Sequence, residues 1–119
     1  MKAITNGLEI KEITVEAARW RKANQIHKWF VDNVQEGQDN CAEYYVSKDK
    51  LKDLLNAVNE VLKDTALASE ILPTQEGFFF GSTDTDVWYF QDLEYTKETL
   101  ENLLSPEFGD WDFYYTSSW

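Results

Sequence analysis

The spacing of apolar residues predicts three helices, and the clearest follows Ser47. Apolar side chains recur there every three or four positions, so they fall on one face of a helix and predict a buried stripe. The residues of this stripe are Leu51, Leu54, Leu55, Val58, Val61 and Leu62. Ser47 is expected to cap the helix, because its hydroxyl can accept a hydrogen bond from a free backbone N–H of the first turn.

A longer helix is expected earlier, from about Val15 to Gln35, with Thr14 as its cap and Gly37 as its stop. Its apolar face is formed by Trp20, Ala23, His27, Phe30, Val31 and Val34. Trp29 falls on the opposite side, among basic residues, where a large ring is a candidate contact point for a partner. Packing of Trp29 against another segment of the same chain is the alternative interpretation.

Short strands are expected where apolar and polar residues alternate or where aromatic residues cluster. This pattern occurs in residues 8–13, in residues 43–46 and in the C-terminal stretch 111–115. Two aromatic triplets, in residues 77–81 and 87–91, enclose a polar turn and predict a hairpin.

The predicted order is strand, helix, strand, helix, hairpin, helix, strand. The third helix is expected to begin at Asp92 or Thr96, and Pro106 and Gly109 break it. This order predicts an α+β fold in which about three helices pack on a small antiparallel sheet. Because the chain has no repeat, low-complexity tract or linker, residues 1–119 are expected to form one domain.

The charge of the chain is strongly uneven. Its net charge is −11. Residues 1–63 hold ten acids and ten bases, whereas residues 64–119 hold twelve acids and a single base, Lys97. Phosphates would be repelled by the second half, so direct binding to nucleic acid is not expected. The asymmetry favours a basic partner, including a protein surface that holds nucleic acid, although a well-solvated surface is the plain alternative.

Cysteine usage and hydropathy predict a cytoplasmic protein. The lone Cys41 excludes an internal disulfide, so the fold needs no oxidising compartment. The first residues lack the apolar core of a signal peptide, and no apolar run approaches the length of a membrane span.

Patterns that would indicate catalysis or a bound ligand are incomplete. Asp84 and Asp86 could offer oxygens to a cation, but no third ligand follows in register. His27 and Cys41 could form a nucleophilic dyad, but acidic neighbours disfavour the thiolate, and His27 fits a core histidine with a polar partner. We therefore predict no catalytic residue, no metal and no cofactor.

The remaining pattern interleaves acids with aromatic residues in the second half of the chain. Rings beside carboxylates are typical of a surface that binds a positively charged groove, where Arg and Lys can both pair and stack. The residues predicted to bind a partner are Asp84, Asp86, Trp88, Asp92, Asp110, Asp112 and Trp29.

Two long segments also resemble a known group of proteins. "ARWRKANQIHKWFVDNVQEGQDNCAEYYVS" and "ILPTQEGFFFGSTDTDVWYFQDLEYT" are similar to small acidic phage and prophage proteins of unknown function, over residues 19–96 or so. This resemblance implies a viral accessory protein that acts in the bacterial cytoplasm. Small acidic phage proteins often block host defences by occupying a nucleic-acid site, so by analogy it implies an inhibitor of the anti-CRISPR type.

The function expected from the sequence is therefore non-enzymatic. An acidic, aromatic-studded surface that mimics nucleic acid would inhibit a host nucleic-acid-handling defence enzyme through protein–protein contact. Two alternatives stay open: a metal-dependent or small-molecule-binding enzyme that uses clustered carboxylates, and a phage structural or assembly protein. The sequence also leaves a homodimer open.

Overall fold

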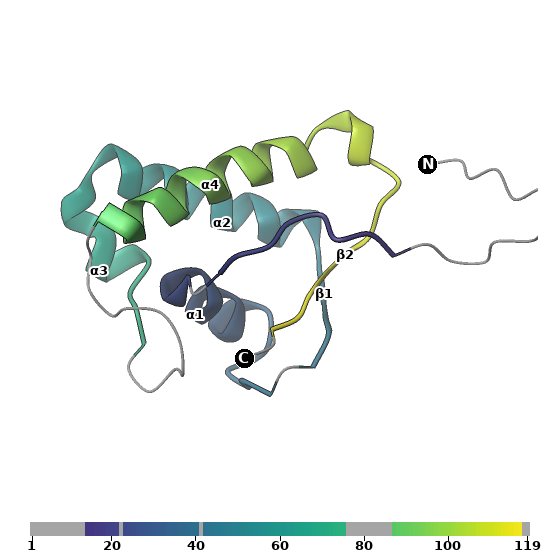
Figure 1. Cartoon of the computed structure of the whole chain (residues 1–119), viewed down its shortest axis with the longest axis horizontal. Coiled ribbons are helices and arrows are strands. Elements are labelled where there is room, and N and C mark those ends of the chain that lie inside the picture. The colour runs from purple at the N-terminus through teal and green to yellow at the C-terminus, as the bar shows by residue number, and fades with distance from the viewer. Residues whose placement is uncertain (1–13, 22, 41, 76–86, 118–119) are drawn as a thin grey trace, which may run out of the picture.

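The computed structural model describes residues 14–21, 23–40, 42–75 and 87–117, which form a single α+β globule (Figure 1). Four helices and a two-stranded antiparallel sheet are present in these residues, so the predicted fold class is confirmed. In chain order the elements are α1 (Asn24–Asn33), β1 (Tyr44–Val46), α2 (Lys48–Lys63), α3 (Ala68–Ile71), α4 (Val87–Leu103) and β2 (Phe113–Tyr115), with 3-10 turns at Thr65–Leu67 and Pro106–Phe108.

The two long helices, α2 and α4, lie side by side and run in opposite directions (Figure 1). Their facing sides build much of the core: Leu54, Val58 and Val61 of α2 and Leu93 and Leu100 of α4 are completely buried. The stripe predicted after Ser47 is therefore confirmed as a core-forming face.

The predicted cap of α2 is also confirmed. The Ser47 hydroxyl accepts a hydrogen bond from the Lys50 backbone N–H at 3.2 Å. This bond satisfies one of the backbone donors that a helix leaves unpaired in its first turn. The helix therefore begins where the sequence places it.

The sheet joins the two halves of the chain. Strands β1 and β2 are antiparallel, with Tyr44 opposite Tyr115, Tyr45 opposite Tyr114 and Val46 opposite Phe113. Its inward face packs on α1, where the Tyr115 ring stacks on Phe30 with centroids 3.9 Å apart and an angle of 6° between the planes. The alternation predicted for the C-terminal stretch is confirmed, since Phe113 and Tyr115 are half-buried and Tyr114 is exposed.

The first helix is much shorter than predicted. It begins at Asn24 instead of Val15, and the described residues before it form neither helix nor strand. Trp20 shows why: its indole N–H donates to the Thr96 hydroxyl at 2.7 Å, and its ring lies against Phe30. Tertiary packing of this ring on α1 and α4 thus outweighs the local helical pattern.

The predicted strand at residues 87–91 is wrong, because these residues form the first turns of α4. In a helix, successive side chains turn by about 100°, so the aromatic triplet separates. Tyr89 is buried and its hydroxyl donates to the Leu72 carbonyl at 2.6 Å, whereas Trp88 faces solvent. The predicted strands at 8–13 and 77–81 lie outside the described residues.

Within the described part of the chain, no helix combines the length and the apolar character that a membrane span needs.

Candidate functional site

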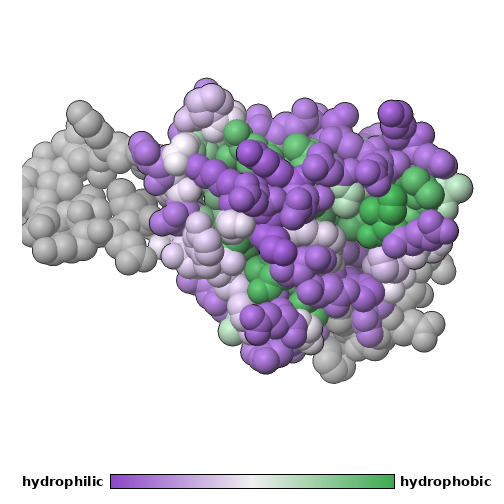
Figure 2. All heavy atoms as spheres, turned by 180° about the vertical axis from the view of Figure 1, so that it is seen from behind, coloured by the Kyte–Doolittle hydropathy of each residue, from purple (hydrophilic) through white to green (hydrophobic). Residues whose placement is uncertain are grey.

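The start of α4 places two of the predicted partner-binding residues at one end of the molecule. Trp88 exposes 69% of its surface, and Asp92, one turn further along, is half-buried. The back of the molecule is largely hydrophilic, but apolar side chains gather at the end where α2 finishes and α4 begins (Figure 2). This end therefore presents an exposed ring near apolar surface. The other two acids predicted here, Asp84 and Asp86, lie outside the described residues.

Two further predicted residues lie beyond the opposite end of α4. Asp110 and Asp112 are both exposed, in the loop that leads from the second 3-10 turn into β2. Because α4 has 17 residues, its axis is about 25 Å long. Of the predicted acids that the structure describes, Asp92 therefore lies in the first half of α4 and Asp110 and Asp112 lie beyond its other end, so they do not form one cluster.

Trp29 does not lie on the surface, so its prediction as a partner-binding residue is wrong. Only 9% of Trp29 is exposed, and its ring meets that of Phe30 edge to face at 5.2 Å. The helical pattern puts Trp29 opposite the apolar face, but α1 is a short helix covered by other segments on more than one side. Packing within the same chain, the alternative considered for this ring, is confirmed.

A row of carboxylates lies along α4 between Asp92 and the loop that holds Asp110 and Asp112. Glu94, Glu98 and Glu101 are spaced four and three residues apart, and all three are exposed. The Cβ atoms of successive members are therefore about 5–6 Å apart along one side of the helix. Within the described residues none of them has a hydrogen-bond or ion-pair partner, and Lys97 forms no ion pair with them. We call these three residues the α4 acid row.

The acids of this row contribute to the net charge but are not among the predicted binding residues. Their spacing of four and then three residues is a signal that the sequence contains. Net charge by itself does not separate these three acids from the other nine in residues 64–119.

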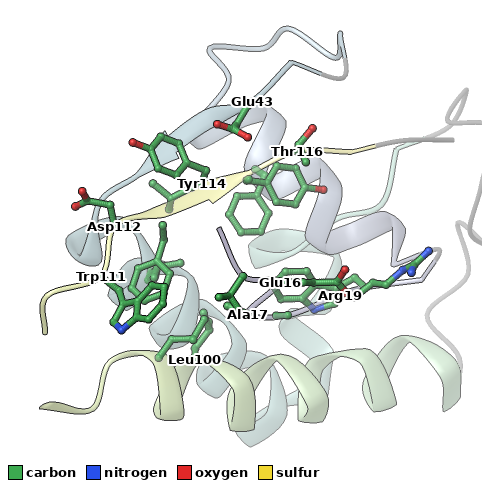
Figure 3. A pocket seen from close by; sticks show the side chains of 18 of the residues that line it. Glu16, Ala17, Arg19, Glu43, Leu100, Trp111, Asp112, Tyr114 and Thr116 are labelled. Atoms are coloured by element: carbon green, nitrogen blue, oxygen red, sulfur yellow. The ribbon is translucent and has the colours of Figure 1, made fainter. Parts of the chain in front are cut away.

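A broad groove of about 1480 Å³ lies between the segment 14–21, the sheet and α4 (Figure 3). Its lining is apolar at the base, with Phe30, Val46 and Leu100 among the residues. Its charged lining is mixed, with the acids Glu16, Glu43, Asp110 and Asp112 and the bases Arg19 and Arg21. The groove therefore carries Asp110 and Asp112 at the end of α4 but is not uniformly acidic.

The segment that forms one wall of this groove is attached at its C-terminal end. The Arg19 backbone N–H donates to the Tyr95 hydroxyl at 3.2 Å, and Trp20 donates to Thr96. The Trp20 ring also meets Tyr95 edge to face, with centroids 6.1 Å apart. These contacts fix the segment to α4.

His27 has the structural role that the sequence predicts. It is 2% exposed, and both ring nitrogens are engaged: Nε2 with an Asp39 carboxylate oxygen at 2.8 Å and Nδ1 with the Tyr115 hydroxyl at 2.6 Å. If Nε2 carries the proton, it donates to Asp39, and Nδ1 accepts from Tyr115. The ring thus ties α1 to β2 and to the loop after α1. Cys41, the other member of the hypothetical dyad, lies outside the described residues.

The fold changes the pKa of the buried Tyr89. Burial raises the pKa of its hydroxyl from 10.0 to about 12, because the phenolate would lose its hydration. Its neutral hydroxyl donates to Leu72, so it fixes α4 to the end of α3. This is a packing role, since the ring lies away from solvent at 3% exposure.

No group of three or more His, Cys, Asp or Glu side chains among the described residues could hold a metal ion. The arrangement of the described acids is a surface and not a coordination site. No family model, curated protein or solved structure matches this chain.

Proposed function

We propose that this protein is a non-enzymatic inhibitor that binds the basic, nucleic-acid-holding surface of another protein. The α4 acid row carries this proposal. Glu94, Glu98 and Glu101 are exposed and unpaired within the described residues, and Asp110 and Asp112 continue the negative charge beyond the end of the helix. Exposed acids that form no ion pair contribute little to folding, so a role in binding is the better explanation for this row.

The length of the acidic surface supports an extended partner groove. From Trp88 to the end of α4 the surface spans more than 20 Å, roughly two-thirds of the length of one turn of B-DNA. Carboxylates at regular intervals along a straight helix resemble the regular negative charge of a nucleic-acid backbone. A groove lined by Lys and Arg would accept such a surface in place of its own ligand.

Exposed aromatic residues add short-range contacts to this long-range attraction. Trp88 lies one turn before Asp92 on α4 and is 69% exposed, so an Arg of a partner could stack on its ring. Charge would speed the encounter, and the rings would slow dissociation. The partner is thus expected to associate quickly and in a salt-sensitive manner.

The biological setting of the proposal comes from the resemblance to small acidic phage proteins. In that setting the partner is a nucleic-acid-handling defence enzyme in the bacterial cytoplasm, and the protein acts as an anti-CRISPR-type inhibitor. The chemistry of the surface is the same for any partner with a basic groove, so the experiment begins without assuming a target.

The test has two steps. The protein is used as bait in a bacterial lysate, and a captured protein is purified and offered its own nucleic acid in competition. We expect the nucleic acid and this protein to exclude one another, and binding to weaken as salt is raised. Simultaneous binding of both ligands, or a dissociation constant that does not change with salt, would contradict charge mimicry. Glu94→Gln, Glu98→Gln and Glu101→Gln together should weaken capture, whereas Asp49→Asn, Asp53→Asn and Glu60→Gln on α2 remove the same charge elsewhere as the control.

A further inference from the structure

The two faces of the β1–β2 sheet differ in character. Side chains alternate along a strand, so Val46 and Phe113 share the inward face, whereas Tyr45 and Tyr114 share the outward one. Tyr45 is 57% exposed and Tyr114 is 58% exposed. Their rings touch across the strands in an edge-to-face arrangement, with centroids 5.7 Å apart. An exposed pair of large rings thus covers the outward face.

Two carboxylates flank this pair of rings. Glu43 precedes Tyr45 by two residues and Asp112 precedes Tyr114 by two residues, so alternation places both acids on the same face as the rings. Because the strands are antiparallel, the acids lie at opposite ends of the face. Figure 3 shows Glu43, Asp112 and Tyr114 on the side of the sheet away from α4. Neither carboxylate has a hydrogen-bond or ion-pair partner in the described part of the chain.

We propose that this tyrosine–carboxylate face binds an arginine side chain of a partner protein. A guanidinium group is planar, so it can stack on a tyrosine ring while its N–H groups pair with a carboxylate. A lysine ammonium can pair with the acid but cannot stack as a plane, so the face should prefer arginine. Charge complementarity therefore identifies the occupant: two unpaired carboxylates and two electron-rich rings suit a cation that is also flat.

This inference rests on the proposed function in one respect, since a basic partner must exist to supply the arginine. It goes further by locating a contact on the sheet, outside the α4 acid row. Tyrosine is well suited to such a contact because it offers a large, rigid surface with only two side-chain torsions to fix. Packing of the sheet on the core uses the opposite face, so the two rings are available to a partner.

The experiment titrates the full chain with a small probe while amide and ring resonances are followed by NMR. The probe is acetyl-Gly-Arg-Gly-amide, and acetyl-Gly-Lys-Gly-amide is its matched comparison. We expect saturable shifts concentrated at Tyr45, Tyr114 and their neighbours, with tighter binding of the arginine probe. Tyr45→Leu and Tyr114→Leu should each weaken that binding by about two- to fivefold, the range for an exposed cation–π contact.

Controls separate this contact from general attraction. Val87→Ala shortens an exposed apolar side chain outside the sheet face and should leave probe binding at the sheet unchanged. Glu43→Gln and Asp112→Asn preserve side-chain shape and should each weaken binding of both probes. Thermal melting of every variant reports whether the fold is retained, and a variant that unfolds is replaced by Tyr→Phe, which keeps the ring and should retain binding.

Two results would overturn the inference while leaving the proposed function intact: shifts confined to the α4 acid row, or equal affinity of the sheet face for the two probes. Absence of any shift would also overturn it. The proposed function fails separately, if the captured partner binds its nucleic acid and this protein at the same time.

Discussion

Helices α2 and α4 share one core but differ in what they show to solvent. Each buries a stripe of apolar side chains against the other. The exposed side of α2 mixes acids with lysines, including Asp49, Lys50, Lys52 and Asp53. The exposed side of α4 carries the acid row with a single base, Lys97. Two helices of similar length that pack on each other thus have very different exposed surfaces.

This difference distinguishes surface charges that serve solubility from surface charges that the fold does not need. A balanced surface such as that of α2 is sufficient for solubility. Like charges three and four residues apart on a helix repel each other by a few tenths of a kcal/mol, and Lys97, at the same spacings from Glu94 and Glu101, offsets this repulsion, so the acid row adds little net stability to α4. A surface that its own helix does not need is the surface that we propose for a partner that compensates the charge.

The largest expected effect on stability comes from substitutions in the core that α2 and α4 share. Leu54→Ala in α2 and Leu93→Ala in α4 each remove a side chain that is completely buried. Each change should lower the free energy of unfolding by about 2–5 kcal/mol, since it loses transfer free energy and leaves a cavity. Chemical denaturation measures this effect, with the exposed Asn56→Ala as control. If one of the two substitutions cost less than about 1 kcal/mol, the helices would not share a core.

Tyr89 makes the packing of α4 depend on pH. Because its pKa is about 12 in the folded protein and 10.0 in the unfolded chain, the folded state holds the proton more tightly. Its contribution to stability is therefore complete below pH 10 and is lost as the pH rises toward 12. Tyrosinate absorbance should show one tyrosine titrating near the upper value, and Tyr89→Phe should remove that phase. A phase that persists in Tyr89→Phe would show that another tyrosine is responsible.

The cap of α2 should contribute a smaller amount. Ser47→Ala removes the acceptor of the Lys50 N–H and should cost about 1 kcal/mol, whereas Ser47→Asp should retain most of the stability. Thermal or denaturant unfolding measures both variants. Equal losses in the two would mean that the hydroxyl acts through packing and not as a cap.

Neutralising the exposed acids should have the smallest effect on the fold. The triple change of Glu94, Glu98 and Glu101 to Gln should leave stability within about 0.5 kcal/mol, because it removes both the repulsion among these acids and their attraction to Lys97. The α2 control at Asp49, Asp53 and Glu60 should not raise stability, because its acids lie among lysines. Melting at low and high salt measures both; a loss above about 1 kcal/mol in the α4 variant would assign the acid row to folding.

The sequence predicted α2 well because independent local signals agree there. The serine cap, the apolar stripe and the short helix length all indicate the same element. It predicted the sheet for a similar reason, since alternation in residues 43–46 and 111–115 matches a sheet with one buried face. The class α+β followed from these elements.

The sequence misjudged the regions where tertiary contacts decide. Trp20 leaves its helical pattern to donate a hydrogen bond to Thr96, 76 residues away. The aromatic run at 88–90 has the composition of a strand. In the structure it is helical, and the helix directs the Tyr89 hydroxyl to the Leu72 carbonyl, to which it donates a hydrogen bond. Trp29 was assigned to a wet face because the segments that cover α1 cannot be inferred from periodicity. Charge alone predicted an acidic surface in the second half of the chain, whereas the row of Glu94, Glu98 and Glu101 along α4 required the structure.

The central claim is that the acid row exists for a partner and not for the fold. Its most direct test is the dissociation constant of a captured partner for the unmodified protein, the α4 triple variant and the α2 control, at low and at high salt. We predict that the α4 variant binds about tenfold more weakly or worse at low salt, as expected for losing three surface ion pairs of about 0.5 kcal/mol each, and that the control binds normally. Equal dissociation constants for the α4 variant and the control would contradict the claim.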